Sequence, residues 1–166
     1  MAVMKSAMTK TVIVVTVAIA SATAQTRDIS PWTFQHYPVV EDFKGSPAKP
    51  LLVTPHERSL RTQILDQAGE GPNFAGHFTI AHWGCGSPCV GFFIINERTG
   101  TIYDPHFAVA CADNNQMDSS LDFNLNSRLI VATRFSDKFG CGTDFLEWDG
   151  KRLKSVYFEP WSSTSE

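Results

Sequence analysis

The chain has neither a long hydrophobic segment nor an excess of basic residues. Its longest apolar run, residues 12–20, is about half of the roughly 20 residues that a membrane-spanning helix needs, which argues against a transmembrane anchor. There are 14 Lys and Arg residues against 17 Asp and Glu, for a net charge of −3. Nucleic-acid-binding domains normally carry a basic stripe, so we expect no nucleic-acid partner. Only Lys151, Arg152 and Lys154 cluster, and we expect them to form a solvated face of a strand.

Redox motifs and internal repeats are also missing. A thioredoxin-type site has two residues between its cysteines and begins a helix. Here three residues separate Cys85 from Cys89, and the sequence predicts strands on both sides. No repeat with a period of about 20–50 residues is visible. We expect no thioredoxin-like chemistry and no bound cofactor.

The N-terminal residues have the pattern of a secretory signal peptide. Lys5 and Lys10 precede the short apolar run, and Ala22-Thr23-Ala24 offers a small-x-small cleavage site before Gln25. No cysteine lies at that point, which argues against a lipid anchor. We therefore expect residues 1–24 to be removed and the protein to be periplasmic or secreted, with no membrane anchor. The remaining 142 residues, with 12 basic and 17 acidic side chains, fit one domain.

The predicted mature chain has three parts. Residues 25–53 contain several prolines and aromatics and are expected to form an extended arm laid across the body. Residues 54–160 are expected to be a single globular β-rich domain, and residues 161–166 a flexible tail. A helix is predicted over residues 55–68, because Thr54 fits an N-cap, Pro55 the first helical position and Glu57 the acid of a capping box.

Most of the domain has the pattern of β-structure. Residues 90–96 are almost continuously apolar, which is typical of a strand buried on both faces. Asp149-Gly150 is a strong signal for a two-residue hairpin turn. Residues 108–120 are expected to be a long irregular loop. Strands are predicted over residues 74–83, 90–96, 101–103, 129–135, 145–148 and 152–158. The predicted fold is α+β and mostly β, an antiparallel meander of about six strands with one amphipathic helix on one face.

Four cysteines in an exported chain favour two disulfides. We favour a bond between Cys85 and Cys89 across the glycine- and proline-rich turn, and a second between Cys111 and Cys141. The alternative joins each cysteine of the turn to one of the later cysteines. Either scheme would stabilise the fold by roughly 2–4 kcal/mol per bond.

The same turn admits two reactive interpretations. In the first, Cys85 or Cys89 is a nucleophile, His82 or His77 is its base, and the glycines beside Cys85 provide an oxyanion hole. His77 and His82 lie five residues apart, so on one strand they would point to opposite faces. In the second, the cysteines hold zinc together with His77, His82 and His106, in a spacing that fits no familiar zinc motif. The residues 104–106 (DPH) predict a turn, with the alternative that His106 lies beside the cysteine turn.

Residues 73–78 (NFAGHF) and 83–89 (WGCGSPC) resemble a group of small exported bacterial proteins of unassigned function. That group has an NFAGxY…WGCGxxC segment, an apolar strand and a turn matched here by residues 99–103 (TGTIY). Phe78 stands where the group has tyrosine. The resemblance implies export and a bacterial envelope, and it implies no activity or catalytic residue.

Taken together, these features favour a binding module over an enzyme. The chain is small, acidic, exported and cross-linked, with protruding loops at residues 84–89 and 108–120 and no complete catalytic constellation. We expect a non-catalytic inhibitor or immunity-type module whose partner is an envelope or secreted protein. The alternative is a cysteine-dependent hydrolase of peptide or cell-wall bonds.

Overall fold

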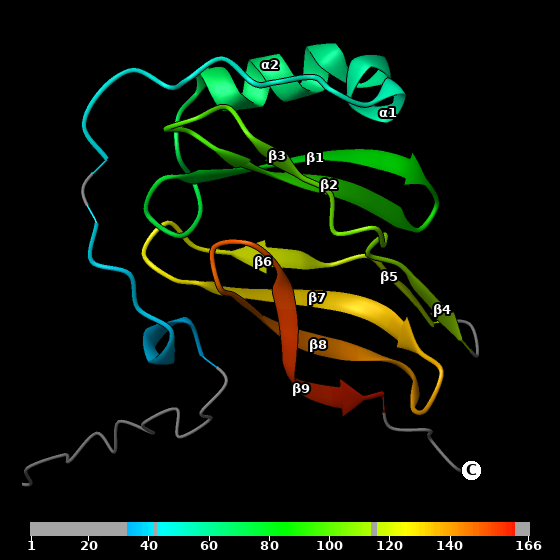
Figure 1. Cartoon of the computed structure of the whole chain (residues 1–166). Coiled ribbons are helices and arrows are strands. Elements are labelled where there is room, and N and C mark those ends of the chain that lie inside the picture. Colours follow the sequence, from blue (N-terminus) through cyan, green and yellow to red (C-terminus); the bar gives the residue numbers. More distant parts are fainter. Residues whose placement is uncertain (1–32, 42, 114–115, 162–166) are drawn as a thin grey trace, which may run out of the picture.

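The computed structural model describes residues 33–41, 43–113 and 116–161, and its fold is α+β with a majority of β-structure, as predicted (Figure 1). Neighbouring strands within each sheet run antiparallel. The predicted signal peptide (1–24), the first part of the predicted arm (25–32) and residues 162–166 of the predicted tail lie outside the described residues.

Within the described residues the strands form three sheets, a division that the predicted meander does not include. The first sheet contains β1 (Phe78–Gly86), β2 (Cys89–Asn96) and β3 (Ile102–Tyr103). The second sheet contains β4 (Cys111–Asp113) and β5 (Gln116–Asp118). The third sheet contains β6 (Leu121–Phe123), β7 (Leu129–Ser136), β8 (Gly140–Trp148) and β9 (Leu153–Pro160). The prediction that residues 108–120 form an irregular loop was wrong, because β4 and β5 lie within them. Strands of three residues are too short to give a clear alternation of apolar and polar side chains.

The predicted helix is present but interrupted. It consists of α1 (Pro55–Ser59) and α2 (Arg61–Gly69), separated by Leu60, whose φ of −103° and ψ of 19° are not helical. The capping box is confirmed: the Thr54 hydroxyl accepts a hydrogen bond from the Glu57 N–H, and the Glu57 carboxylate accepts one from the Thr54 N–H. The fully buried apolar side chains of the helical segment, Ile64 and Ala68, both lie on α2.

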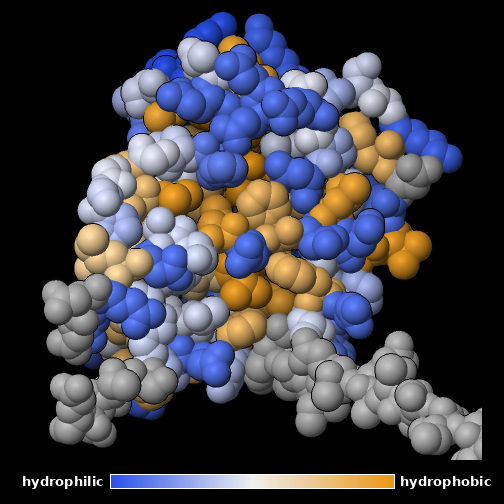
Figure 2. Space-filling view, turned by 180° about the vertical axis from the view of Figure 1, so that it is seen from behind, coloured by the Kyte–Doolittle hydropathy of each residue, from blue (hydrophilic) through white to orange (hydrophobic). Residues whose placement is uncertain are grey.

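The core consists of two apolar clusters on opposite faces of the first sheet. On one face Phe93 and Ile95 of β2 pack with Ile64 of α2. On the other face Phe92 and Ile94 pack against the third sheet through residues such as Ile130, Leu146 and Trp148. β2 is therefore buried on both faces, as predicted, and the helices, the first sheet and the third sheet form successive layers (Figure 1). Seen from behind, the helical end is mostly hydrophilic and hydrophobic residues gather in the middle of the face (Figure 2).

β1 begins and ends later than predicted, at Phe78 and Gly86 instead of residues 74 and 83. Residues 74–77 form a tight turn instead, in which the main-chain groups of Phe74 and Phe78 bond each other and Ala75 and Gly76 have φ of 43° and 81°. Gly76 has no room for a side chain, because a Cβ there would lie 2.8 Å from the Cβ of Glu41. The turn therefore serves as the docking point of the N-terminal arm.

The described part of the arm, residues 33–41 and 43–53, runs along one side of the body (Figure 1). A short 3-10 turn, η1 (Phe34–His36), precedes main-chain bonds from Val39 to Asn126 and from Leu51 to Gly100. Glu41 adds ion pairs with His77 and Arg98. The arm is thus tied to both the first and the third sheet, as the sequence predicted for an arm laid across the body.

Candidate functional site

The two disulfides favoured from the sequence are present. Cys85 and Cys89 are joined at the tip of the β1–β2 hairpin, with their Cα atoms 5.0 Å apart. Cys111 of β4 is joined to Cys141 of β8, with their Cα atoms 5.7 Å apart. No cysteine of the chain is free in this structure. The proposed nucleophiles Cys85 and Cys89 therefore have no thiolate while their bond is intact.

The histidines considered as bases or ligands have other partners. The Nδ1 atom of His77 lies 2.8 Å from the Glu41 carboxylate, in the turn that docks the arm. His82 is exposed on β1, where its main-chain N–H and C=O bond the side-chain amide of Gln67. His106 lies beside Asp104. Among the residues that the structure describes, no three His, Cys, Asp or Glu side chains are placed to hold a metal ion.

A surface hollow of about 310 Å³ opens beside the disulfide-closed hairpin, and we call it the hairpin hollow. α1, β1, β2 and the segment that follows β3 contribute to its walls. Its lining consists of His56, Trp83, Cys85, Gly91, Phe92, Asp104, His106, Phe107 and Ala108. It therefore combines aromatic, imidazole and carboxylate groups within reach of one occupant.

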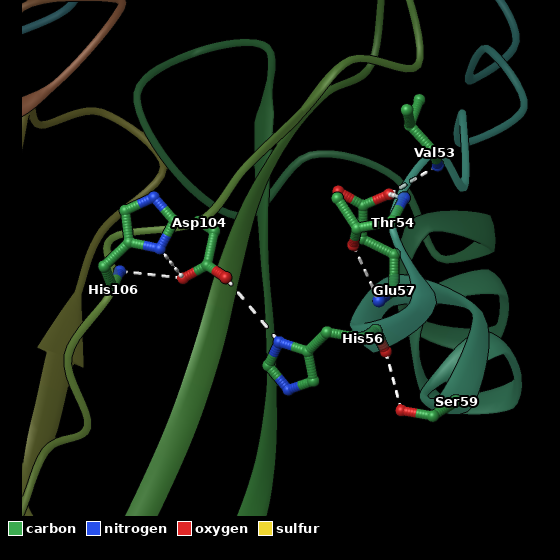
Figure 3. A network of polar contacts seen from close by, with 7 residues as sticks. All are labelled: Val53, Thr54, His56, Glu57, Ser59, Asp104 and His106. Atoms are coloured by element: carbon green, nitrogen blue, oxygen red, sulfur yellow. Dashed lines mark hydrogen bonds and ion pairs between the residues drawn. The ribbon is translucent and has the colours of Figure 1, made fainter.

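Asp104 is the centre of the polar contacts in the hairpin hollow (Figure 3). One of its oxygens lies 3.6 Å from Nδ1 of His56, and the other lies 3.5 Å from Nδ1 of His106. The same oxygen that faces His106 also accepts that residue's main-chain N–H at 2.7 Å. This is the turn predicted for residues 104–106, and it places His106 in the left-handed region, with φ of 59°. The predicted turn is thus present, and His106 lines the hairpin hollow together with Cys85.

The capping box fixes the position of His56 on the opposite wall. Thr54 and Glu57 close the first turn of α1, so the intervening His56 side chain is directed toward Asp104 (Figure 3). Its ring meets Trp83 edge-on at 5.7 Å between ring centroids. His56 and His106 remain open to solvent, with 54% and 85% of their side chains exposed. Both imidazoles are therefore available to an external molecule.

The groups that line the hairpin hollow are carboxylate, imidazole and aromatic side chains together with the disulfide-bonded Cys85. The nearby Ser59 hydroxyl donates to the main-chain carbonyl of His56, not to its ring (Figure 3). A carboxylate–imidazole pair needs a hydroxyl or thiol hydrogen-bonded to the ring to form a hydrolytic triad. The groups that are present can donate and accept hydrogen bonds and offer aromatic surface.

The sequence indicated part of this site. The hairpin cysteines and His106 were singled out, whereas His56, Trp83 and Asp104 were not expected to act together. His56 comes from the helix and Asp104 from the end of β3, and no local spacing connects them. The capping box of Thr54 and Glu57 was the one local pattern that could have pointed to His56, since it orients the residue that it encloses.

The fold and the hairpin hollow define a mostly β, disulfide-bonded protein of the α+β class. Comparisons with protein-family models, with curated proteins and with solved structures found no significant match. Within the described residues no helix has the length and apolar character needed to cross a membrane. The two disulfides indicate an oxidising, extracellular type of environment.

Proposed function

We propose that this protein is an exported, non-catalytic binding module of the inhibitor or immunity type, which binds an envelope or secreted protein through the hairpin hollow. One observation carries the proposal: Trp83, Asp104 and two exposed histidines line one hollow beside a hairpin whose tip is closed by a disulfide. Aromatic side chains in fixed pockets are common anchors of protein interfaces.

The rigidity of this surface supports a role in binding. The Cys85–Cys89 bond limits the movement of the hairpin tip, and the Trp83 ring is seated against Gly91, where a Cβ would lie 2.5 Å from the indole. A surface that is ordered before binding loses less conformational entropy when a partner docks. The hairpin hollow is therefore suited to a specific complex.

Export is supported by three features of the chain. Residues 1–24 have the pattern of a signal peptide, all four cysteines are bonded, and the segment around the hairpin resembles small exported bacterial proteins. A periplasmic or extracellular location follows from the same features as part of the proposal.

Site-specific photo-crosslinking tests the proposal in the producing cell. A photoreactive amino acid is placed at residue 56, which is exposed in the hairpin hollow, and in a control protein at residue 138 in the β7–β8 turn. We expect one protein to be crosslinked from residue 56 and not from residue 138. Equal crosslinking from both positions, or none from residue 56, would contradict the proposal.

The same material tests the cysteine-hydrolase alternative. The exported protein is treated with a thiol-alkylating reagent without reductant, and its mass is measured. We expect no alkyl group on any cysteine, because both disulfides are intact. An alkyl group on Cys85 or Cys89, together with cleavage of the crosslinked partner, would favour the hydrolase instead.

A further inference from the structure

A second cavity, of about 350 Å³, lies where the end of β3 approaches the turn between β8 and β9, and we call it the aromatic cavity. Apolar and aromatic residues provide one part of its lining, namely Ile94, Tyr103, Pro105, Phe107, Trp148 and Leu153. Ionisable residues provide the rest, namely Asp104, His106, Arg134, Lys151 and Arg152. Its volume is within the lower part of the range of small-molecule sites.

The charge of the aromatic cavity differs from that of the whole chain. The chain has a net charge of −3, whereas the lining has three Lys or Arg side chains against the single carboxylate of Asp104. That carboxylate is already flanked by His56 and His106. Arg134 and Arg152 have acid partners outside the lining, Asp144 and Asp149, so among the described residues Lys151 is the lining cation without an ion pair that an anion could meet.

Arg134 is held in place at this cavity. Its Nη1 donates to the Asp144 carboxylate at 3.1 Å, and its guanidinium lies 4.5 Å above the centre of the Phe107 ring. Asp144 is itself anchored, because it accepts a hydrogen bond from the Ser155 hydroxyl. A guanidinium has five N–H donors, so an Arg134 oriented in this way retains donors for a second acid.

The β8–β9 turn places Lys151 at the cavity as well. One oxygen of Asp149 accepts the main-chain N–H groups of Lys151 and Arg152, at 2.8 and 2.9 Å. Arg152 also forms an ion pair with Asp149, whereas Lys151 forms no ion pair with any described residue. The sequence predicted that Lys151 and Arg152 form part of a solvated face. In the structure, both residues also line the aromatic cavity.

We propose that the aromatic cavity binds a small amphipathic carboxylate, with the apolar part of the ligand on the aromatic floor and its acid at Arg134 and Lys151. The chemistry recognised is an apolar or aromatic group a few bonds from a carboxylate. A free organic acid and the C-terminal residue of a polypeptide both present it. The aromatic cavity shares Asp104, His106 and Phe107 with the hairpin hollow, but neither Arg134 nor Lys151 lines the hairpin hollow.

The test is a titration of the isotope-labelled protein followed by NMR, with 3-phenylpropionate, its amide and 3-phenylpropylamine as matched anionic, neutral and cationic probes. We expect the acid to bind about tenfold more tightly than the amide, because its hydrogen bonds are to charged groups. Shifts should be confined to residues 94, 103–107, 134 and 148–153. Equal affinities for the three probes, shifts elsewhere, or no shifts at millimolar acid would each overturn the proposal.

Charge reversal provides the second measurement. Lys151→Glu should weaken binding of the acid about tenfold, while Lys138→Glu, an exposed lysine outside the cavity, should leave it unchanged. Equal effects of the two variants would overturn the assignment.

The two sources of the acid are distinguished with the tripeptide Gly-Gly-Phe and its C-terminal amide. Tighter binding of the tripeptide acid than of 3-phenylpropionate supports a polypeptide C-terminus, and the reverse order supports a free acid. Because residue 151 does not line the hairpin hollow, the Lys151→Glu variant should still be crosslinked to the partner protein from residue 56. Loss of acid binding therefore tests the aromatic cavity, and loss of crosslinking from residue 56 tests the hairpin hollow, so the two proposals can fail separately.

Discussion

Glu97 is a carboxyl group that the fold encloses without stabilising its charge. Its side chain is fully buried, and neither oxygen has a hydrogen-bond partner among the described residues. Burial raises the pKa of Glu97. A hydrogen bond from the nearby Thr79 hydroxyl would lower this pKa, but that hydroxyl donates to the main-chain carbonyl of Gly71. The folded state therefore favours the protonated, neutral form of this acid more than the unfolded state does.

The Glu97→Gln variant should be more stable than the parent protein at neutral pH, by about 1–3 kcal/mol. A raised pKa in the folded state means that the parent loses stability as the pH rises from the unfolded value, about 4.3, through the folded value. The variant lacks this loss. Denaturant unfolding between pH 4 and pH 8 should show a difference that grows with pH. The control Glu70→Gln, at an exposed position, should show none, and parallel curves for Glu97→Gln and parent would refute the argument.

Gly91 on β2 is required because the Trp83 ring lies against it. A Cβ at residue 91 would lie 2.5 Å from the indole, whereas a Cβ at Gly84 of the same hairpin would meet nothing within 4 Å. We expect Gly91→Ala to reduce the free energy of unfolding by about 1–3 kcal/mol through overpacking. Gly84→Ala should leave it nearly unchanged. Equal unfolding midpoints of the two variants would show that Trp83 moves freely and is not seated as described.

At the scale of the elements, the outer edge of β1 is closed by two side-chain amides. Asn73 accepts the N–H of Ile80 and donates to its C=O, and Gln67 of α2 makes the same pair of bonds with His82. Each amide thereby imitates one residue of a neighbouring strand. An unpaired strand edge invites association with other chains, so these amides protect the first sheet.

Replacing Asn73 tests this role of the amides. In Asn73→Ala the N–H and C=O of the buried Ile80 lose their partners, which should reduce the free energy of unfolding by about 1–3 kcal/mol. Hydrogen exchange of the Ile80 amide should accelerate strongly. In the matched variant Gln67→Ala the effect should be smaller, because His82 is exposed and water can replace the lost bonds. Unchanged exchange at Ile80 in Asn73→Ala would contradict this account.

Local signals in the sequence predicted local structure well. The capping box at Thr54 and the burial of β2 on both faces depend on neighbouring residues, and both were predicted correctly. All neighbouring strands within the three sheets are consecutive in sequence, so the division depends on where this pairing stops, which no local pattern reveals. The strands β4 and β5 were missed because three residues are too short to show an alternation. The candidate site depends on distant segments, because His56 and Asp104 meet only after the helix has packed beside the first sheet.

At the scale of the whole molecule, the two disulfides have different effects. Cys85–Cys89 closes the tip of one hairpin over a sequence separation of 4, whereas Cys111–Cys141 spans 30 residues and ties the β4–β5 hairpin to the third sheet. The entropy lost by the unfolded chain grows with the length of the closed loop. The longer bond therefore contributes more to the stability of the fold, and the shorter one to the shape of the hairpin hollow.

Paired Cys→Ala variants separate these roles. Removing Cys111 and Cys141 should reduce the free energy of unfolding by about 4 kcal/mol, and removing Cys85 and Cys89 by about 2 kcal/mol. Denaturant unfolding under non-reducing conditions measures both values. A larger loss for the hairpin pair would show that the tip stabilises the core directly, contrary to this division of roles.

The most direct test of the central claim is the affinity of the crosslinked partner, purified, for the parent protein and for a His56→Ala/His106→Asn double variant. Asparagine is used at residue 106 because it tolerates the positive φ there. We predict that the double variant binds about tenfold more weakly or worse, while Lys138→Glu binds like the parent. Equal affinities of the parent and the double variant would show that the hairpin hollow is not the binding site.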